Sequence, residues 1–482
     1  MNIPTPAEAA AHDAAVVRDL DHLGLPPRAW TAGIAAPDGS RALDVLVVGA
    51  GMCGIAAAGA LVFKGVRDIA VLDEAAPGSE GPWTTTARMA TLRSPKHLPG
   101  IALGIPSLTF RAWFTARRDE AAWDALYKIA NADWQDYLTW LQRSLALPVR
   151  HGVAMRAIHP DGTLFRIEAG DSTLYARHVV LATGRLGAGG MAIPDFIDRA
   201  LWPDRAAHAA EAIDFARLAG RRVAVLGANA AAFDNAATAL EAGAAAVDMY
   251  CRRPALPQVN KSRGATNPGY FEGWSALSPA ERWKLLVWLH DERSPPPHES
   301  VHRVLRHPGF RLHFATPILA ASPAPDGVAL SLPEGIATAD FLIVATGFEV
   351  NLARRPELAA IAPHIALWSH AYPAPPGLDR PELSRHPFLG VGFELTEKNP
   401  GTCPALARLH VFNHAAHASM GPIASDIPGV SAAAGLLSTA IVRALFTADR
   451  DALQDRLAAF AEPELQTTPF FAPHLLSAAP SA

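Results

Sequence analysis

The chain has 482 residues, of which 50% are hydrophobic and 18% are charged. This length is enough for about two to four domains and a large cofactor site, and the apolar content excludes a disordered protein. The formal net charge of −4 provides no basic excess to attract a nucleic acid or an anionic membrane, so neither partner is expected.

The cysteines and the N-terminus indicate the compartment. Cys53, Cys251 and Cys403 stand far apart, which excludes a disulfide framework and a Cys-x-x-Cys motif. The first residues lack the basic and apolar regions of a secretory signal, so a cytoplasmic protein is expected. The stretch 429–446 is apolar, but Arg443 and several hydroxyl side chains interrupt it, and it predicts a buried helix rather than a membrane span.

The first half of the chain opens with a predicted helix over 6–23 and a connector rich in proline and glycine. The apolar run 45–48 then predicts a strand buried on both faces. It leads into Gly49-Ala50-Gly51-Met52-Cys53-Gly54, an alanine-rich helix to about residue 64, a second buried strand over 69–72, and Asp73-Glu74. This order of strand, glycine turn, helix, strand and acid is a βαβ unit.

The glycine turn has the spacing G-x-G-x-x-G of a dinucleotide-binding loop. Gly49 allows the tight turn, Gly51 lets a pyrophosphate approach the backbone, and Gly54 lets the helix pack closely on the strand. The helix N-terminus offers N–H groups to the phosphates, and Asp73 stands where ribose hydroxyls are held. The sequence therefore predicts a bound dinucleotide.

A second, degraded unit follows in the middle of the chain. The strand 222–226 runs into Gly227-Ala228-Asn229-Ala230-Ala231-Ala232, then a helix through Leu240 and a strand over 246–250. Asn229 replaces the middle glycine and would crowd a pyrophosphate, so a nucleotide binds here differently or poorly. Arg252 and Arg253 end the second strand, and their guanidinium groups suit the 2′-phosphate of NADP, although a vestigial fold with surface arginines is an alternative.

Two further apolar runs, 178–184 and 341–347, each end in Ala-Thr-Gly. One follows each nucleotide-binding unit, which suggests one domain interrupted by a second, with the chain crossing near 185–205 and returning near 335–350.

Together these features resemble the two-domain flavoprotein monooxygenases, a group that includes the flavin-containing, N-hydroxylating and Baeyer–Villiger enzymes. The resemblance covers about residues 41–450 and rests on the paired units, on Gly81-Pro82-Trp83, and on Ala345-Thr346-Gly347-Phe348. One departure is the family fingerprint F-x-G-x-x-x-H-x-x-x-W/Y at 202–212, which keeps His208 but lacks the glycine and the final aromatic residue.

The resemblance implies an α/β fold with two Rossmann-like dinucleotide-binding domains, in which an NADPH-binding domain is inserted into a discontinuous FAD-binding domain. The expected parts are an N-terminal helical extension, the first part of the FAD-binding domain, the NADPH-binding domain and the second part of the FAD-binding domain, over residues 1–40, 41–205, 206–335 and 336–482.

The resemblance also implies the site residues. The residues expected to bind FAD or NADPH are Gly49, Gly51, Gly54, Asp73, Glu74, Trp83, Arg88, Gly227, Asn229, Arg252, Arg253 and Asp426. The residues expected at the reaction centre are Trp83, Lys96 and His414, with Arg93 as a further anchor for the substrate or the nicotinamide. The substrate is expected between the domains, against loops 93–118 and 259–275.

The implied reaction is hydride transfer from NADPH to FAD, formation of a flavin hydroperoxide from dioxygen, and insertion of one oxygen atom into a small nitrogen- or sulfur-containing metabolite or a ketone. Disulfide reductases share the layout but use a cysteine pair beside the flavin, whereas Cys53 stands alone, so dioxygen is the expected acceptor. An FAD-dependent NAD(P)H oxidase or reductase and a flavin-binding protein without turnover are alternatives. Formation of a homo-oligomer is left open.

A competing motif lies at 298–302, where His-Glu-Ser-Val-His matches the HExxH pattern of zinc hydrolases. Three prolines directly before His298 favour a solvent-exposed helix start, so no metal is expected and a zinc hydrolase through His298 and His302 is a remote alternative. The spacing of Trp274, Trp283 and Trp288 favours helix packing over a substrate cage.

Overall fold

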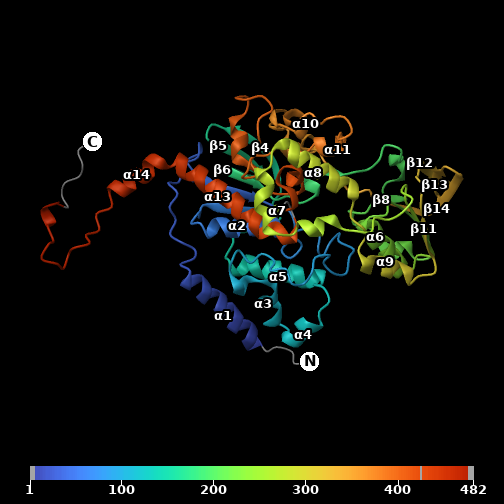
Figure 1. The fold of residues 1–482 in the computed structure, drawn as a ribbon, viewed down its shortest axis with the longest axis horizontal. Coiled ribbons are helices and arrows are strands. Elements are labelled where there is room, and N and C mark those ends of the chain that lie inside the picture. The colour runs from blue at the N-terminus through green and yellow to red at the C-terminus, as the bar shows by residue number, and fades with distance from the viewer. Residues whose placement is uncertain (1–5, 424–425, 476–482) are drawn as a thin grey trace.

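The computed structural model describes residues 6–423 and 426–475. A seven-stranded sheet lies at the centre of the molecule in the order β3-β2-β1-β6-β5-β4, with β17 also paired to β6 (Figure 1). Its strands are β1 (Leu43–Val48), β2 (Ile69–Asp73), β3 (Val149–His151), β4 (Met155–Asp161), β5 (Leu164–Ala169), β6 (Ser172–Leu181) and β17 (Leu409–Val411).

This sheet is parallel where it carries the first glycine loop. β1 pairs in parallel with β2 and with β6, with Val47 opposite Val71 on one side and opposite Val180 on the other. All three valines are buried, as expected for parallel strands covered on both faces. β4 and β5 instead form an antiparallel hairpin that continues into β6, so β6 begins at Ser172, earlier than the predicted run at 178.

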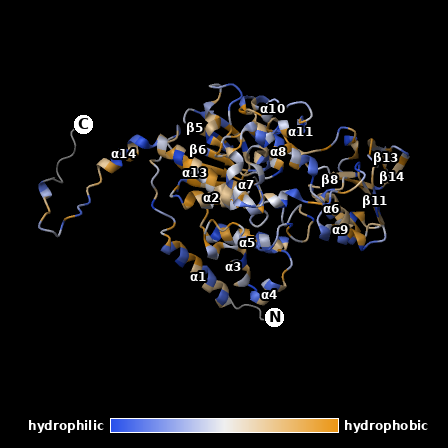
Figure 2. Ribbon diagram, viewed as in Figure 1, coloured by the Kyte–Doolittle hydropathy of each residue, from blue (hydrophilic) through white to orange (hydrophobic). Residues whose placement is uncertain are grey.

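Two helices pack on each other over this sheet. α2 (Met52–Val62) follows the glycine loop and contacts β1 and β2, while α13 (Val430–Ala448) packs against α2. Buried alanines at 56–58 let the helix lie close to its neighbours. In Figure 2 the strands and these helices carry much of the apolar colour at the centre of the molecule. The predicted helix over 429–446 is confirmed by α13, and its buried face includes Leu437 and Ile441.

Within the part of the chain that the structure describes, one helical stretch, Ile427–Ala448, is long and apolar enough to cross a membrane by length and composition alone. It includes the core helix α13, and 44% of its most apolar window is buried inside the protein.

A second sheet contains the degraded nucleotide unit. It is parallel throughout, in the order β11-β10-β9-β15-β8, and lies at the right of Figure 1 with α6 and α9 beside it. A small antiparallel sheet, β12-β13-β14, adjoins it. The elements are β8 (Ala206–His208), β9 (Arg222–Leu226), α6 (Ala230–Glu241), β10 (Ala246–Tyr250), α9 (His298–Leu305), β11 (Phe310–His313), β12 (Ala320–Ala324), β13 (Gly327–Leu332), β14 (Gly335–Ala339) and β15 (Phe341–Val344).

The place of β15 corrects one predicted boundary. β15 pairs with β9 and β8, so it belongs to the second sheet, whereas the sequence-based boundary at 335 assigned it to the other unit. The chain returns after this strand, where β16 (Phe348–Val350) pairs antiparallel with β7 (Gly189–Met191). These two short strands lie on the two segments that connect the sheets, so both connections run side by side.

The remaining helices surround the two sheets (Figure 1). The predicted N-terminal helix is present as α1, and α14 lies at the left of the view in Figure 1. The bounds are α1 (Pro6–His22), α3 (Phe110–Thr115), α4 (Glu120–Ala125), α5 (Asn131–Ser144), α7 (Pro268–Gly273), α8 (Pro279–Glu292), α10 (Trp368–Ala371), α11 (Pro381–Ser384), α12 (His417–Met420) and α14 (Arg450–Ala458).

A buried ion cluster ties the first sheet to the end of α13. The guanidinium of Arg177 on β6 lies 2.9 Å from Asp44 and 2.5 Å from Asp449, and all three side chains are almost completely buried. Asp449 also accepts the backbone N–H of Ala32 at 2.9 Å. Buried charges are tolerated only when they are paired, so this cluster is a point at which loss of one partner destabilises the fold.

Candidate active site

At two positions of the first glycine loop, the geometry of the polypeptide itself requires glycine. Gly49 has a φ of +102°, and a Cβ atom there would overlap with the carbonyl of Ala182. A Cβ atom on Gly54 would overlap with the carbonyl oxygen of Gly49. Both positions therefore exclude a side chain for reasons of turn geometry and of close contact between the helix and the loop.

Gly51 differs, because nothing in the chain requires a glycine there. Its φ of −71° and ψ of −171° suit any residue, and a Cβ atom would meet nothing closer than 4.0 Å, the nearest atoms belonging to Gly81. Gly51 is also the N-cap of α2 and makes no side-chain capping bond, so the first turn presents uncapped N–H groups. The free space and the donors fit the pyrophosphate of FAD.

Asp73, the last residue of β2, forms hydrogen bonds with the glycine loop and with the residues that follow the strand. The Asp73 carboxylate accepts the N–H of Ala50 at 2.6 Å and the N–H of Ala75 at 2.8 Å, which fixes the loop against the strand end. Glu74 is exposed beside it. Each Asp73 oxygen keeps a further acceptor site, so binding of ribose hydroxyls remains a prediction for this residue.

A buried polar network supports the same loop and was missed by the sequence analysis. Glu80 is 1% exposed and lies 2.6 Å from Nε2 of His151, and it accepts the Gln135 amide at 3.0 Å. Gln142 donates to Glu80 at 3.4 Å and to the carbonyl of Ala50 at 3.1 Å. The only sequence signal was the position of Glu80 directly before Gly81-Pro82-Trp83, because its partners come from α5 and β3.

Trp83 and Arg88 lie on the segment that follows this network. Trp83 is half-buried and packs edge to face on Trp134, with ring centroids 6.3 Å apart. It lies next to Gly81, which faces Gly51. The Arg88 guanidinium donates to the carbonyl of Glu211 at 3.1 Å, beside the second sheet. Arg88 thus connects the two halves of the molecule, and its contact with a cofactor stays a prediction.

Lys96 and Arg93 are held by other parts of the chain. Lys96 donates to the carbonyl of Trp123 at 2.6 Å and to that of Asp124 at 3.2 Å, and it does not line the cavity described below. Arg93 forms an ion pair of 3.0 Å with Asp234 on α6. The structure therefore does not bring Lys96 together with His414 at one centre, because its ammonium group binds carbonyl oxygens in the last turn of α4.

The second loop retains the turn but not the open middle position. Gly227 has a φ of +120°, and a Cβ atom there would lie 2.6 Å from the carbonyl oxygen of Ala345. Asn229 is the N-cap of α6, and its side-chain oxygen accepts a hydrogen bond of 2.8 Å from Arg253. The side chain is thus drawn to Arg253 at the end of β10, while Arg252 lines the neighbouring cavity.

That cavity has a volume of about 590 Å³ and lies where the two sheets and the C-terminal segment meet. Its wall comes from Arg185 after β6, the second glycine loop, the segment 262–274, α8, the Ala-Thr-Gly segment before β16, α11, and residues within 414–422 and 426–428. Of the two loops predicted to hold a substrate, 259–275 contributes to the wall, whereas no residue of 93–118 does. Helix α3 and its neighbours pack instead on α5 and α1.

Trp274 marks one wall of this cavity. It is 2% exposed, and its ring packs so closely on Gly421 that a Cβ atom on this glycine would overlap with it. Gly421 has a φ of +67°, a second reason for glycine at this position. Trp283 is buried among the helices, as predicted, whereas Trp288 is 46% exposed.

Four histidines line the cavity, and burial lowers the pKa of each: His290, His386, His414 and His417. The pKa of His386 falls to about 3. The rings of His414 and His417 stack at 5.8 Å. At neutral pH the four imidazoles are therefore uncharged, and a neutral ring carries one N–H donor and one nitrogen acceptor. Nδ1 of His386 lies 3.0 Å from the carbonyl oxygen of Ala415, so this ring has only its other nitrogen for a ligand.

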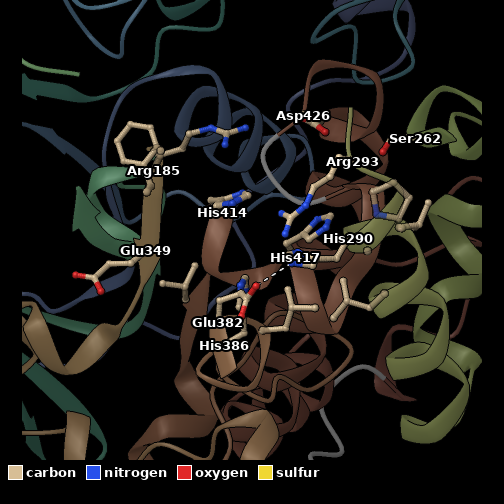
Figure 3. A pocket seen from close by; sticks show the side chains of 18 of the residues that line it. Arg185, Ser262, His290, Arg293, Glu349, Glu382, His386, His414, His417 and Asp426 are labelled. Atoms are coloured by element: carbon tan, nitrogen blue, oxygen red, sulfur yellow. Dashed lines mark ion pairs between the residues drawn. The ribbon is translucent and has the colours of Figure 1, made fainter. Parts of the chain in front are cut away.

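Two arginines add positive charge to the same space (Figure 3). Arg185 lines the cavity, and within the described residues no hydrogen bond or ion pair engages its guanidinium group. Arg185 is exposed to solvent, and the charge of Asp426 acts on its guanidinium group. Arg293 has a φ of +58° and a ψ of 163°, a backbone conformation that is otherwise almost restricted to glycine. Such strain is typical of functional sites, where it holds a side chain in place.

The HExxH motif has a different environment. His298 and His302 lie on the exposed side of α9, with their Nε2 atoms 2.9 Å apart. Glu299 instead forms an ion pair of 2.8 Å with Lys128 and accepts the Tyr127 hydroxyl at 2.7 Å, contacts that lower its pKa to about 2 against the effect of burial. Over residues 6–423 and 426–475, no group of three or more metal-ligating side chains is found.

Comparisons with known proteins agree with this layout. Residues 46–266 match the family described as pyridine nucleotide-disulphide oxidoreductase. Among solved structures, an ornithine hydroxylase from Pseudomonas aeruginosa superposes with a TM-score of 0.66 at 19% identity, over 84% of this chain and 100% of that one. An ornithine N-hydroxylase from Kutzneria sp. 744 gives 0.67 at 15% identity, over 84% and 99%. The fold is therefore the α/β fold of the flavin monooxygenases, with Rossmann-type nucleotide units.

A relative with higher sequence identity shows the family to which this chain belongs. The chain is 40% identical to the FAD-dependent urate hydroxylase of Xanthomonas campestris pv. campestris over 442 residues, which is 91% of this chain and 93% of that protein. The chain belongs to the family of flavin-dependent monooxygenases that includes this hydroxylase, which confirms the family predicted from the sequence motifs.

Proposed function

We propose that the protein is an FAD- and NADPH-dependent monooxygenase that hydroxylates urate or a closely related purine anion with dioxygen. The observation that carries the substrate class is the Arg185 guanidinium, which lines a cavity with neutral imidazoles and is engaged by no side chain or carbonyl of residues 6–423 and 426–475. Guanidinium groups donate to anions, and neutral imidazoles both donate and accept, a set that matches the alternating N–H and C=O groups of such a ring. The relative that bears the name urate hydroxylase supports the same class.

The residues that would hold the cofactors belong to the two glycine loops. The free space at Gly51 and the donors of α2 would take the FAD pyrophosphate, with Asp73 and Glu74 at the ribose and Trp83 near the ring system. Gly227, Arg252 and Arg253 would take NADPH, with Asn229 turned toward Arg253. Asp426 lines the cavity beside Arg185 and would face the flavin side. When bound, FAD supplies the redox chemistry, accepting a hydride from NADPH and activating dioxygen.

The division into domains follows the two sheets in this proposal. The seven-stranded sheet would form the FAD-binding domain from residues 41–205 together with the C-terminal part of the chain. The five-stranded sheet, including β15, would form the inserted NADPH-binding domain. The separate thiols of Cys53, Cys251 and Cys403 support a cytoplasmic location.

The cavity residues would bind the substrate, orient it and exclude water. Trp274 and Phe271 supply apolar walls, and the turn before α12 and its first residue supply His414 and His417. A dry, shaped site favours transfer of oxygen to the substrate over loss of reducing equivalents as hydrogen peroxide.

A coupled turnover assay tests the proposal. The purified protein should contain FAD, NADPH should reduce it anaerobically, and urate with oxygen should then give one hydroxylated product per NADPH consumed. A protein without flavin would contradict the proposal. NADPH consumption that yields hydrogen peroxide at every purine tested would favour the oxidase alternative, for which Asn229 in the second loop is the structural argument.

Replacing Arg185 should weaken substrate binding specifically. We expect Arg185→Gln to raise the KM for urate by about 10- to 150-fold, because a hydrogen bond to a charged group contributes about 1.5–3 kcal/mol. Anaerobic reduction of FAD by NADPH should stay unchanged. Arg199→Gln is the control, since Arg199 is exposed and stacks on Trp202 outside the cavity. An unaltered KM would exclude Arg185 as the anion-binding group.

A further inference from the structure

A carboxylate–imidazole pair stands on the cavity wall, formed by His290 near the end of α8 and Glu382 on α11 (Figure 3). Nε2 of His290 lies 2.9 Å from Oε1 of Glu382. The two atoms are close without full hydrogen-bond alignment, as is common in catalytic pairs before the substrate tightens the site. No sequence motif joins these residues, so only the fold shows the pair.

The charges around the pair set its protonation. Burial lowers the pKa of His290, and the charge of Arg293 acts in the same direction, while Glu382 opposes both. For Glu382, burial alone would raise the pKa, but its own backbone N–H, His290 and Arg293 lower it on balance. At neutral pH the pair is therefore an ionised carboxylate beside a neutral imidazole, which is the resting state of a general base with its orienting acid.

The side chain of Glu382 is 56% exposed, whereas that of His290 is 15% exposed. The pair thus links His290 on the cavity wall to the exposed carboxylate of Glu382, which can exchange protons with water. Arg293, the residue that follows α8, lines the same cavity, and its positive charge acts on both groups.

Resting on the proposed function, we propose that His290 is the general base of the hydroxylation and that Glu382 is its positioning residue. A purine anion attacks electrophilic oxygen more readily once a further ring N–H proton is removed. In this step the N–H bond breaks, its electron pair stays on the ring, and the proton passes to the free nitrogen of His290. Glu382 stabilises the imidazolium, which releases the proton to water after the product leaves. The oxygen atom and the reducing electrons come from dioxygen and NADPH, so no other reactant is needed.

Other titratable groups face His290 and define what a pH profile reports. Asp291 and Arg293 lie at the end of its own helix, Glu382 on α11, His386 just after α11, and His417 at the start of α12, and the two histidines are close enough to interact electrostatically with His290. Both facing histidines also have lowered pKa values, so a variant at His290 is needed to assign the acid limb of the profile.

The test compares His290→Gln and Glu382→Gln in the FAD-loaded enzyme. We expect His290→Gln to reduce hydroxylation of urate by about 10²- to 10⁴-fold, the range of general-base catalysis, with electrons diverted to hydrogen peroxide. Reduction of FAD by NADPH should remain within about twofold of the wild type, since the pair is assigned no part in that step. Glu382→Gln should slow hydroxylation and also move the acid limb of kcat/KM to lower pH, because the carboxylate raises the pKa of His290. A residue with only a structural role would not move this limb.

The control is His159→Gln, which removes a carboxylate-paired histidine on the β4–β5 hairpin, 3.6 Å from Glu168 and far from the cavity wall. Hydroxylation at the wild-type rate with an unchanged pH profile in both cavity variants would overturn the assignment of the base. Failure of the wild type to hydroxylate urate would instead overturn the proposed function. Flavin content and circular dichroism of each variant separate both outcomes from misfolding.

Discussion

Replacing Gly51 with valine should yield a folded protein that no longer binds FAD and has no monooxygenase activity. The backbone at Gly51 suits any residue, and the nearest atoms to a Cβ there lie 4.0 Å away, so the chain has room for a β-carbon at this position. A valine at this N-cap costs about 0.5–2 kcal/mol of stability. The isopropyl group would occupy the space that we assign to the pyrophosphate, where the backbone must come close to the ligand.

The measurements for Gly51→Val are the visible flavin absorbance of the purified protein and its circular dichroism. Gly435→Val on α13 is the control, because Gly435 also has no atoms within 4 Å of a Cβ and lies outside the loop. Gly54→Ala should behave differently and fail to fold properly, since its Cβ would overlap with the carbonyl of Gly49. Full flavin content in Gly51→Val would show that the pyrophosphate does not approach this glycine.

Replacing Arg177 with methionine should lower the free energy of unfolding by about 3–5 kcal/mol, because it leaves buried charges without a partner. The carboxylates of Asp44 and Asp449 lie 2.9 Å and 2.5 Å from the guanidinium and are 0% and 4% exposed. Neither can turn to solvent without moving β1 or the end of α13. Urea denaturation at neutral pH measures the effect.

The pH dependence of this deficit distinguishes charge from packing. Without Arg177 the buried carboxylates take up protons at higher pH than they do in the unfolded chain. A raised pKa in the folded state gives stability that is lost as the pH rises, so the deficit should shrink when the pH is lowered. Arg222→Met is the control, because its ion pair with Asp340 is exposed and is worth about 0–1 kcal/mol. A deficit that is equal at all pH values would indicate lost packing alone.

The nucleotide units could be read from the sequence because their signals are local. The buried runs before Gly49 and Gly227 became β1 and β9, and the helices after them became α2 and α6, near the predicted limits. Each of these features depends on hydrogen bonds and sterics within one short segment. The same holds for the long apolar helix near the C-terminus.

Other predictions required knowledge of which segments meet. Lys96 was placed at the reaction centre by resemblance, but its ammonium group binds carbonyl oxygens in the last turn of α4. β15 was assigned to the wrong unit, because an apolar strand that ends in Ala-Thr-Gly fits either sheet until its neighbours are known. Glu80 and its partners were not singled out, since a buried acid is recognised only by what surrounds it.

The sequence by itself therefore determined the α/β class, the family and the loop that would hold FAD, since these follow from residue order over short stretches. Only the tertiary structure decided the composition of the cavity, because Arg185, His290, Glu382 and His414 come from four segments with no common spacing. Packing of the two sheets against the C-terminal segment brings them within reach of one small molecule. Burial at that junction, and not any property of the residues alone, keeps the histidines neutral beside the Arg185 guanidinium.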